Sequence, residues 1–122
     1  MRDELLLQRI DFLINQINII KKDTQNVSLA EFGKSDLLIR ATAFSVVQIG
    51  EQTVKLEEEL KTKYPFVKWT QIRGMRNFIV HDYGNVDIQE LFKTIHEDLD
   101  DLYCSMIEIR KDIKTKKDSI TE

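Results

Sequence analysis

The sequence predicts an all-α protein, an up-and-down four-helix bundle with one additional short helix. Three observations support this fold class. The 122 residues include only one proline and four glycines, too few for the turns of a many-stranded sheet. Apolar residues recur at helical steps of three and four along several long stretches, and residues that start or stop helices separate those stretches. A chain of this length is expected to form one domain with a single core.

The first helix is expected from Asp3 to about Lys22. Its apolar residues repeat with helical spacing and predict one buried face, formed by Leu6, Ile10, Leu13, Ile17 and Ile20. After a polar segment, Ser28 and Glu31 form a capping-box pattern that opens the additional short helix, which Gly33 could stop. Ser35 is then expected to cap the next helix.

The second long helix is expected from Asp36 to about Lys63, antiparallel to the first and ending before Pro65. Its predicted buried seam is Ile39, Thr42, Val46, Ile49, Thr53, Leu56 and Leu60. A shorter helix is expected from about Lys68 to Asp82, with Gly84 as its C-terminal stop. The apolar side of this shorter helix would be Ile72, Met75, Ile79 and Val80.

The last long helix is expected to open at a second capping-box pattern, from Asp87 to Glu90. Its predicted seam is Ile88, Leu91, Ile95, Leu99, Leu102, Met106, Ile109 and Ile113. We expect the bundle to occupy residues 1–110 and residues 111–122 to form a charged tail with a frayed end. The core is expected to contain Leu13, Ile17, Val46, Ile49, Ile79, Leu99 and Leu102.

The charge balance gives no overall sign of nucleic-acid binding, because the formal net charge is −3. A local patch would have to bind a nucleic acid instead. Five cations fall within one short region and are candidates for such a patch: Lys61, Lys63, Lys68, Arg73 and Arg76. The alternative interpretation of these cations is an ordinary solvated face.

The ends and the single cysteine indicate the compartment. The first residues lack the basic region and apolar run of a signal peptide, and no stretch is apolar for long enough to span a bilayer. We therefore expect a cytoplasmic protein with no membrane partner. Cys104 has no partner for an internal disulfide and lies in an apolar run, so we expect a reduced, buried thiol without a catalytic role.

Several classes of site are not indicated by the sequence. Two histidines and one cysteine on different helices do not form a metal-binding cluster, so neither a metal nor a cofactor is expected. His96 lies among charged residues and is expected at the surface. The glycine-rich phosphate loop of nucleoside triphosphatases and the Gly-x-Ser-x-Gly turn of hydrolases are both absent from the sequence.

The segment from Arg76 to Tyr83 holds the candidate functional residues, because Arg76, Asn77, His81 and Tyr83 cluster there. At about 100° per residue, Arg76 and His81 lie about 140° apart around a helix, whereas Arg76 and Tyr83 share one face. One helix alone would not bring Arg76 and His81 to the same phosphate. Two copies related by a twofold axis could bring the Arg76 and His81 of one copy near those of the other, so we expect a homodimer.

These residue types suit cleavage of an RNA phosphodiester without a metal. His81 could take the proton of a 2′-hydroxyl or protonate the leaving oxygen, and Arg76 could stabilise the phosphate. A histidine near a helix C-terminus has its protonated form favoured by the helix dipole. Asn77, one turn from His81, could orient the imidazole or hold a phosphate oxygen. The alternative is a set of ordinary polar residues at the end of an exposed helix, and spacing alone does not separate the two.

A longer pattern around these residues resembles the HepT family of HEPN proteins. Its hallmark, Arg-x4-His-x-Tyr, is present at Arg76, His81 and Tyr83. The likeness covers the chain from the first helix to about Ile109. The other matching segments are Gln48 to Glu51, Tyr64-Pro65, Trp69 to Asn77, His81 to Gly84 and Val86-Asp87.

The resemblance implies a ribonuclease with the HEPN fold, the toxin of a type VII toxin–antitoxin system, whose dimer lines one cleft with two motifs. It implies that Arg76 and His81 form the catalytic pair, with Asn77 as a supporting residue, and Arg73 is a further supporting candidate in the same basic region. It also implies that a minimal nucleotidyltransferase antitoxin, MntA, transfers AMP from ATP to Tyr83 and silences the nuclease.

A second hypothesis remains beside the nuclease. Some relatives bind partners without cutting RNA, so the chain could be a non-catalytic helical module that docks a minimal nucleotidyltransferase and presents its substrate. The intact motif favours the nuclease, since a scaffold does not require Arg76 and His81 together.

Overall fold

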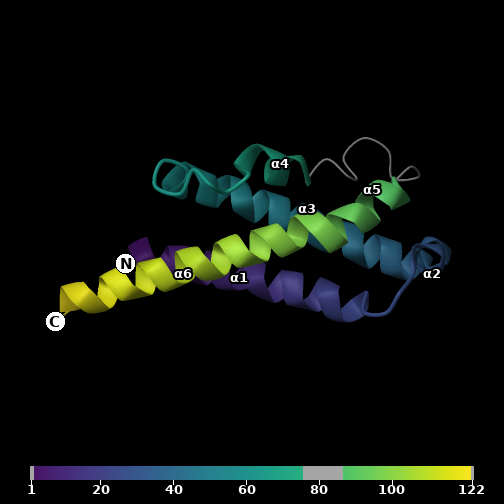
Figure 1. Ribbon diagram of the computed structural model, residues 1–122, viewed down its shortest axis with the longest axis horizontal. Coiled ribbons are helices and arrows are strands. Elements are labelled where there is room, and N and C mark those ends of the chain that lie inside the picture. The colour runs from purple at the N-terminus through teal and green to yellow at the C-terminus, as the bar shows by residue number, and fades with distance from the viewer. Residues whose placement is uncertain (1, 76–86, 122) are drawn as a thin grey trace.

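The computed structural model describes residues 2–75 and 87–121, with side chains of the last helix described as far as Lys116. The described elements are all helices, so the predicted all-α class is confirmed (Figure 1). The long elements are α1 (Arg2–Asp23), α3 (Asp36–Leu60) and α6 (Leu99–Thr121). The shorter elements are α2 (Leu29–Lys34), α4 (Trp69–Arg73), α5 (Ile88–Lys93) and the π-helical segment η2 (Thr94–Asp98).

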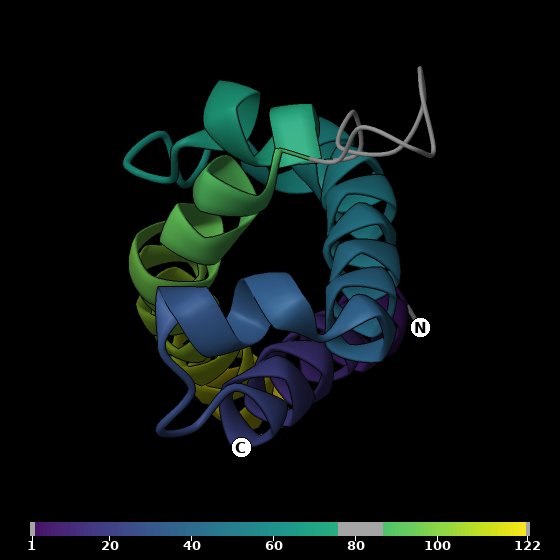
Figure 2. The ribbon, with the colours of Figure 1, turned by 90° about the vertical axis from the view of Figure 1, so that its right-hand side faces the viewer.

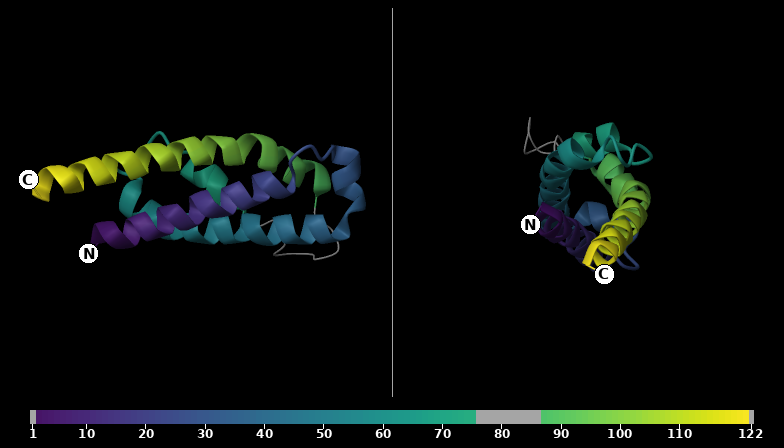
Figure 3. Two further views of the ribbon diagram at one scale, coloured as in Figure 1. Left: turned by 90° about the horizontal axis from the view of Figure 1, so that it is seen from below. Right: turned by 90° about the vertical axis from the view of Figure 1, so that its left-hand side faces the viewer.

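The helix α1 runs antiparallel to both α3 and α6, as ion pairs at its two ends show. Arg2 at the start of α1 lies 2.6 Å from Glu59 near the end of α3, and Lys21 near the end of α1 lies 2.5 Å from Asp100 at the start of α6. Both pairs are partly exposed and contribute little stability. They nevertheless show the relative directions of the three long helices. Both chain ends lie at one end of the bundle (Figure 3).

The core forms where the predicted apolar seams of the three long helices meet. The α1 seam from Leu6 to Ile20 is buried throughout, and so is the α3 seam from Thr42 to Leu60, whereas Ile39 is half-buried. Burial of these side chains is the main favourable contribution to folding. Six of the seven residues expected in the core are buried: Leu13, Ile17, Val46, Ile49, Leu99 and Leu102. The seventh, Ile79, lies outside the described residues.

The helix starts follow the predicted caps. The Ser28 side chain accepts a hydrogen bond from the Glu31 backbone N–H, and the Glu31 carboxylate accepts one in return from the Ser28 N–H, which completes the capping box. Ser35 caps α3 by accepting a hydrogen bond from the Leu38 backbone N–H, and Asp87 caps α5 by accepting one from the Glu90 N–H. At its other end α3 stops at Leu60, about one turn before the expected Lys63.

The last helix differs from the expectation in containing the π-helical segment η2. It continues to Thr121, and Ile113, the last residue of its predicted seam, is buried. The prediction of a buried Cys104 is wrong, because this thiol is exposed. Two residues rotate a helix by about 200°, so Cys104 lies on the opposite side from the buried Leu102.

The helix α2 lies across one end of the bundle, where α3 begins and α5 begins (Figure 2). Phe32 of α2 is fully buried, and its ring centroid lies 5.5 Å from that of Phe92 on α5. This contact attaches the start of the last helix to the rest of the core. None of the described helices is long and apolar enough to cross a membrane.

Candidate ribonuclease site

The motif residues Arg76, Asn77, His81 and Tyr83 lie outside the described residues, as do the predicted turns from Arg76 to Asp82 and the stop at Gly84. The described chain supplies the two flanks of this segment. Met75 ends the first flank, and Asp87 opens the second. The geometry described below is therefore that of the two flanks of the candidate site.

The flank that leads into the motif is α4, and one side of it is fixed in the core. Trp69, Ile72 and Met75 are each less than a tenth exposed. The Trp69 indole N–H also donates a hydrogen bond of 3.1 Å to the backbone oxygen of Tyr64. Because α4 has only five residues, this burial and not its intrinsic helix propensity must hold it in place.

Arg73, the supporting candidate on α4, forms an ion pair with α3. Its Nε lies 3.0 Å from Glu57 Oε1, and its Nη2 donates a hydrogen bond of 3.0 Å to Thr70 Oγ1. The Nε atom is buried without a well-aligned hydrogen bond, so its contact with Glu57 is electrostatic. The Glu57 side chain is only 13% exposed, whereas that of Arg73 is 43% exposed. Arg73 therefore balances a nearly buried carboxylate and still reaches solvent.

The flank that follows the motif begins at Asp87 and runs into α5. The Asp87 side chain caps this helix by accepting a hydrogen bond of 3.1 Å from the Glu90 backbone N–H. One turn further along, Phe92 contacts the ring of His96 at a centroid distance of 4.3 Å. His96 is exposed, which confirms its interpretation as a surface residue.

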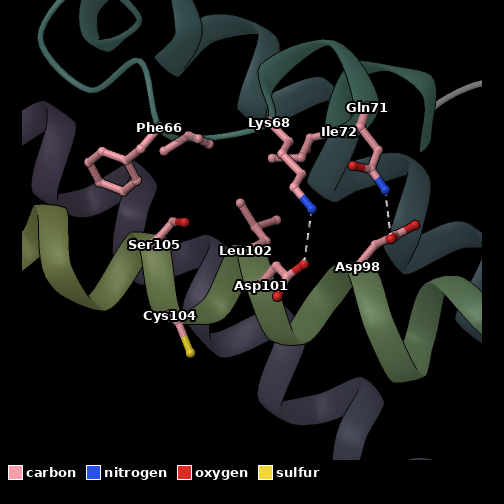
Figure 4. Close-up of a pocket in the computed structure, with 10 residues that line it drawn as sticks. Phe66, Lys68, Gln71, Ile72, Asp98, Asp101, Leu102, Cys104 and Ser105 are labelled. Atoms are coloured by element: carbon pink, nitrogen blue, oxygen red, sulfur yellow. Dashed lines mark hydrogen bonds and ion pairs between the residues drawn. The ribbon is translucent and has the colours of Figure 1, made fainter.

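A hollow of about 300 Å³ lies beside α4, between the loop that precedes it and α6 (Figure 4). Two polar contacts cross it. Gln71 Nε2 donates a hydrogen bond of 2.7 Å to Asp98 Oδ1, and Lys68 Nζ lies 3.6 Å from Asp101 Oδ2. Burial raises the pKa of Asp98, and a hydrogen bond from Thr94 opposes that rise. Sequence reasoning missed this hollow, because its walls are some thirty residues apart in the chain.

The predicted basic patch is partly neutralised in the structure. Lys68 and Arg73 have acidic partners, Asp101 and Glu57 respectively. Lys61 and Lys63 are exposed in the loop after α3. The pKa of Lys63 is lowered, chiefly by its contact with Lys116 of α6, which places two lysines side by side near Asp112.

The acidic and sulfur-bearing side chains show no metal-binding arrangement within residues 2–75 and 87–116. No group of three or more His, Cys, Asp or Glu side chains in that part of the chain is placed to hold a metal ion. The Asp98 and Asp101 carboxylates each have a cationic or amide partner instead.

Comparison with known protein families identifies the chain. The model of the HepT-like family, described as ribonuclease HepT-like, matches residues 13–109, a range that includes the motif and both of its flanks. The chain belongs to the HepT-like ribonuclease family. The resemblance seen in the sequence is thereby confirmed, and the helical bundle described above is the fold on which this family member carries its motif.

Curated relatives agree with membership of the HepT-like family. A ribonuclease candidate of Caldanaerobacter subterraneus subsp. tengcongensis is 31% identical over 87% of this chain and 88% of its own length. A probable ribonuclease HepT of Thermococcus cleftensis is 26% identical over 84% of this chain and 93% of its own length. A ribonuclease candidate of Methanocaldococcus jannaschii is 25% identical over 93% of this chain and 88% of its own length. No solved structure gives a significant match.

Proposed function

We propose that this HepT-like protein is a metal-independent endoribonuclease that acts with Arg76 and His81 at a homodimer cleft. The observation that carries the proposal is the family match over residues 13–109, which spans the whole Arg-x4-His-x-Tyr motif. Relatives named as ribonucleases cover most of the chain, so RNA is the proposed substrate.

The proposed reaction is an internal transesterification of the RNA backbone. His81 takes the proton of a ribose 2′-hydroxyl, whose oxygen attacks the adjacent phosphorus while the bond to the 5′-oxygen breaks. A second acid, supplied in the proposal by the partner's motif, returns a proton to the leaving oxygen. Arg76 stabilises the crowded, negatively charged phosphate, and Asn77 orients the imidazole or a phosphate oxygen. The products are a 2′,3′-cyclic phosphate and a 5′-hydroxyl.

The described flanks support such a site by holding both ends of the motif segment. Met75 is 2% exposed at one end, and at the other end the capped helix α5 is attached to the core through Phe92 and Phe32. Catalytic groups require rigid supporting elements if they are to be held in productive geometry. Arg73, which balances Glu57, is proposed to support the electrostatics of the same region.

We also propose that the protein is the toxin of a type VII toxin–antitoxin pair in the cytoplasm. Its partner would be a minimal nucleotidyltransferase of the MntA kind, which transfers AMP to Tyr83 and so silences cleavage. This part of the proposal follows from the family resemblance and from the tyrosine at the third motif position.

The test of the proposed activity is cleavage of single-stranded RNA by the purified protein with a chelator present. His81→Ala and Arg76→Ala should each lower the cleavage rate by about 10²–10⁴-fold, the usual contribution of general acid–base catalysis. His96→Ala is the matched control, because this second histidine of the sequence is exposed on η2 and contacts Phe92. Circular dichroism establishes that each variant keeps its helices.

Two results would refute the proposed mechanism: cleavage that appears only after a divalent metal is added, or full activity of His81→Ala. Tight binding of a minimal nucleotidyltransferase by a wild-type protein that does not cut RNA would favour the non-catalytic module instead.

A further inference from the structure

An aromatic ring stands exposed at the mouth of the hollow beside α4. Phe66 is 54% exposed although it is a large apolar side chain. Its loop is not loosely attached, because Tyr64 and Val67 on either side of it are buried. The Tyr64 ring meets the Phe66 ring edge-on at a centroid distance of 6.1 Å. The fold therefore holds Phe66 at the surface, where its face can contact a ligand.

The hollow presents different chemistry at its two ends. Figure 4 shows Phe66 at one end and the Gln71–Asp98 pair at the other, with Lys68 and Asp101 between them. Leu102 and Ile72 supply further apolar lining. An apolar surface with a few convergent polar groups is the usual composition of a small-molecule site.

The charges of the lining decide which part of a nucleotide would enter. Asp98 and Asp101 outnumber Lys68, so a phosphate would meet net negative charge inside the hollow. An uncharged base would not be repelled by this negative charge. Carboxylates also accept hydrogen bonds from the amino groups of bases. Phosphates would instead find cations outside the hollow, at Lys61 and Lys63, which are both exposed.

We propose that this hollow, the Phe66 pocket, binds one unpaired base of single-stranded RNA. The base stacks on Phe66, its edge faces Gln71 and Asp98, and the adjoining backbone follows Lys61 and Lys63. Stacking of bases on aromatic side chains beside a basic groove is the general mode of single-strand binding. The inference rests on the proposed function, to which it adds a binding site for the substrate away from the cleaved bond.

The pocket lies within reach of the cleavage motif along the chain. Arg76 is five positions after Gln71, so even a fully extended chain could not place their Cα atoms more than roughly 18 Å apart. A single strand that occupies the pocket could thus extend to the motif over a few nucleotides. The base bound at Phe66 would then fix the position of the strand relative to Arg76 and His81.

The test is the affinity for a fluorescently labelled single-stranded RNA, measured by anisotropy in a His81→Ala background so that the RNA stays intact. Phe66→Ala should weaken binding about five- to a hundred-fold, as expected when one stacked base loses its platform. Phe66→Trp should preserve binding. The matched control is Phe44→Ala, which removes a ring that is 60% exposed on α3, away from the pocket. Helix content and sedimentation are measured first, to show that all variants retain the parent's fold and assembly.

A second titration separates stacking from charge. An abasic RNA of the same length keeps its phosphates but has no base to stack, so Phe66→Ala should not change the affinity for it. The double variant Lys61→Gln with Lys63→Gln should instead weaken the binding of both RNAs. The Phe66 pocket would be overturned if Phe66→Ala and Phe44→Ala changed the RNA affinity equally. It would also be overturned if Phe66→Ala lowered the affinity for the abasic RNA as much as that for the intact RNA. If wild type cuts RNA in either of those cases, only this inference fails. If Phe66-dependent binding is found without any cleavage by wild type, the proposed nuclease activity fails and the RNA pocket stands.

Discussion

The Tyr64 hydroxyl, in the loop after α3, donates a hydrogen bond to Asp112 Oδ2 on α6. Lys116 lies 3.1 Å from the same carboxylate oxygen. Burial and the contact with Asp112 raise the pKa of Tyr64 to about 12. The hydrogen bonds from Tyr64 and Lys116 lower the pKa of Asp112. The link therefore ties the loop that carries Phe66 to the second half of α6.

We predict that Tyr64→Phe destabilises the fold by about 1.5 kcal/mol near neutral pH, the low end for loss of a hydrogen bond to a charged group, because Asp112 is partly exposed. Tyr64 has its pKa raised, so its contribution is complete below its ordinary value of 10.0 and is lost as the pH approaches 12. Asp112 has its pKa lowered, so its contribution is present above its ordinary value of 3.8 and is lost as the pH falls through the lowered value. The free energy of unfolding of the variant should thus be lower than that of wild type between these two pH limits. Outside them the two free energies should converge.

Urea unfolding followed by the fluorescence of Trp69, the only tryptophan, measures this difference. Tyr103→Phe is the control, since Tyr103 is a half-buried tyrosine of α6 that packs against the core. Equal unfolding midpoints for Tyr64→Phe and wild type at neutral pH would contradict the prediction.

Much of the fold could be predicted because the same periodicity governs helix geometry and burial. The α1 seam from Leu6 to Ile20 is an example, since each step of three or four residues returns a side chain to the same face. The caps at Ser28 and Ser35 were equally predictable, because a cap depends on residues next to each other in the chain. The error at Cys104 came from giving a local apolar run more weight than the helical rotation.

The features that were not predicted depend on contacts between distant segments. The π-helical segment ends at Asp98, whose carboxylate accepts hydrogen bonds from Thr94 within the segment and from Gln71 on α4. The spacing of apolar residues along one helix does not report such contacts. The pairing of Arg73 with Glu57 is likewise a contact across helices, so the sequence showed Arg73 only as one cation among several.

The Arg73–Glu57 pair leads to a prediction that separates a structural from a supporting role. Arg73→Ala leaves the Glu57 carboxylate, which is 13% exposed, without its cation and should destabilise the fold by about 1 kcal/mol. Adding Glu57→Gln removes the uncompensated charge and should restore most of that stability. If Arg73 also supports the RNA phosphate, the double variant should remain slow in RNA cleavage. Full recovery of both stability and cleavage would assign Arg73 to structure alone.

The motif spacing predicts a homodimer whose interface includes the shorter helix expected from about Lys68 to Asp82 and the start of the last helix. In the expected dimer the two copies of His81 lie in one cleft, because an interface that includes the motif places equivalent residues near the twofold axis. Sedimentation velocity at micromolar concentration should show a dimer, and cysteine crosslinking should locate the interface after Cys104 has been replaced by serine, since it is the only cysteine. A monomer at that concentration, or a dimer with its two His81 side chains on opposite outer surfaces, would contradict this prediction.

The last prediction concerns silencing of the nuclease at Tyr83. By the helical step Tyr83 shares a face with Arg76, so an AMP group on its hydroxyl would bring a phosphate to the place proposed for the RNA backbone. Incubation with the cognate nucleotidyltransferase and ATP should add one or more adenylyl masses to wild type, as measured on the intact protein, and should stop cleavage. Tyr83→Phe should fold, gain no such mass at that position and resist silencing. Tyr64→Phe and Tyr103→Phe, which remove the other two tyrosine hydroxyls, should be modified as wild type is. Equal adenylylation of the Tyr83→Phe protein would move the regulatory site to another residue, because the hydroxyl that accepts the AMP must then lie elsewhere in the chain.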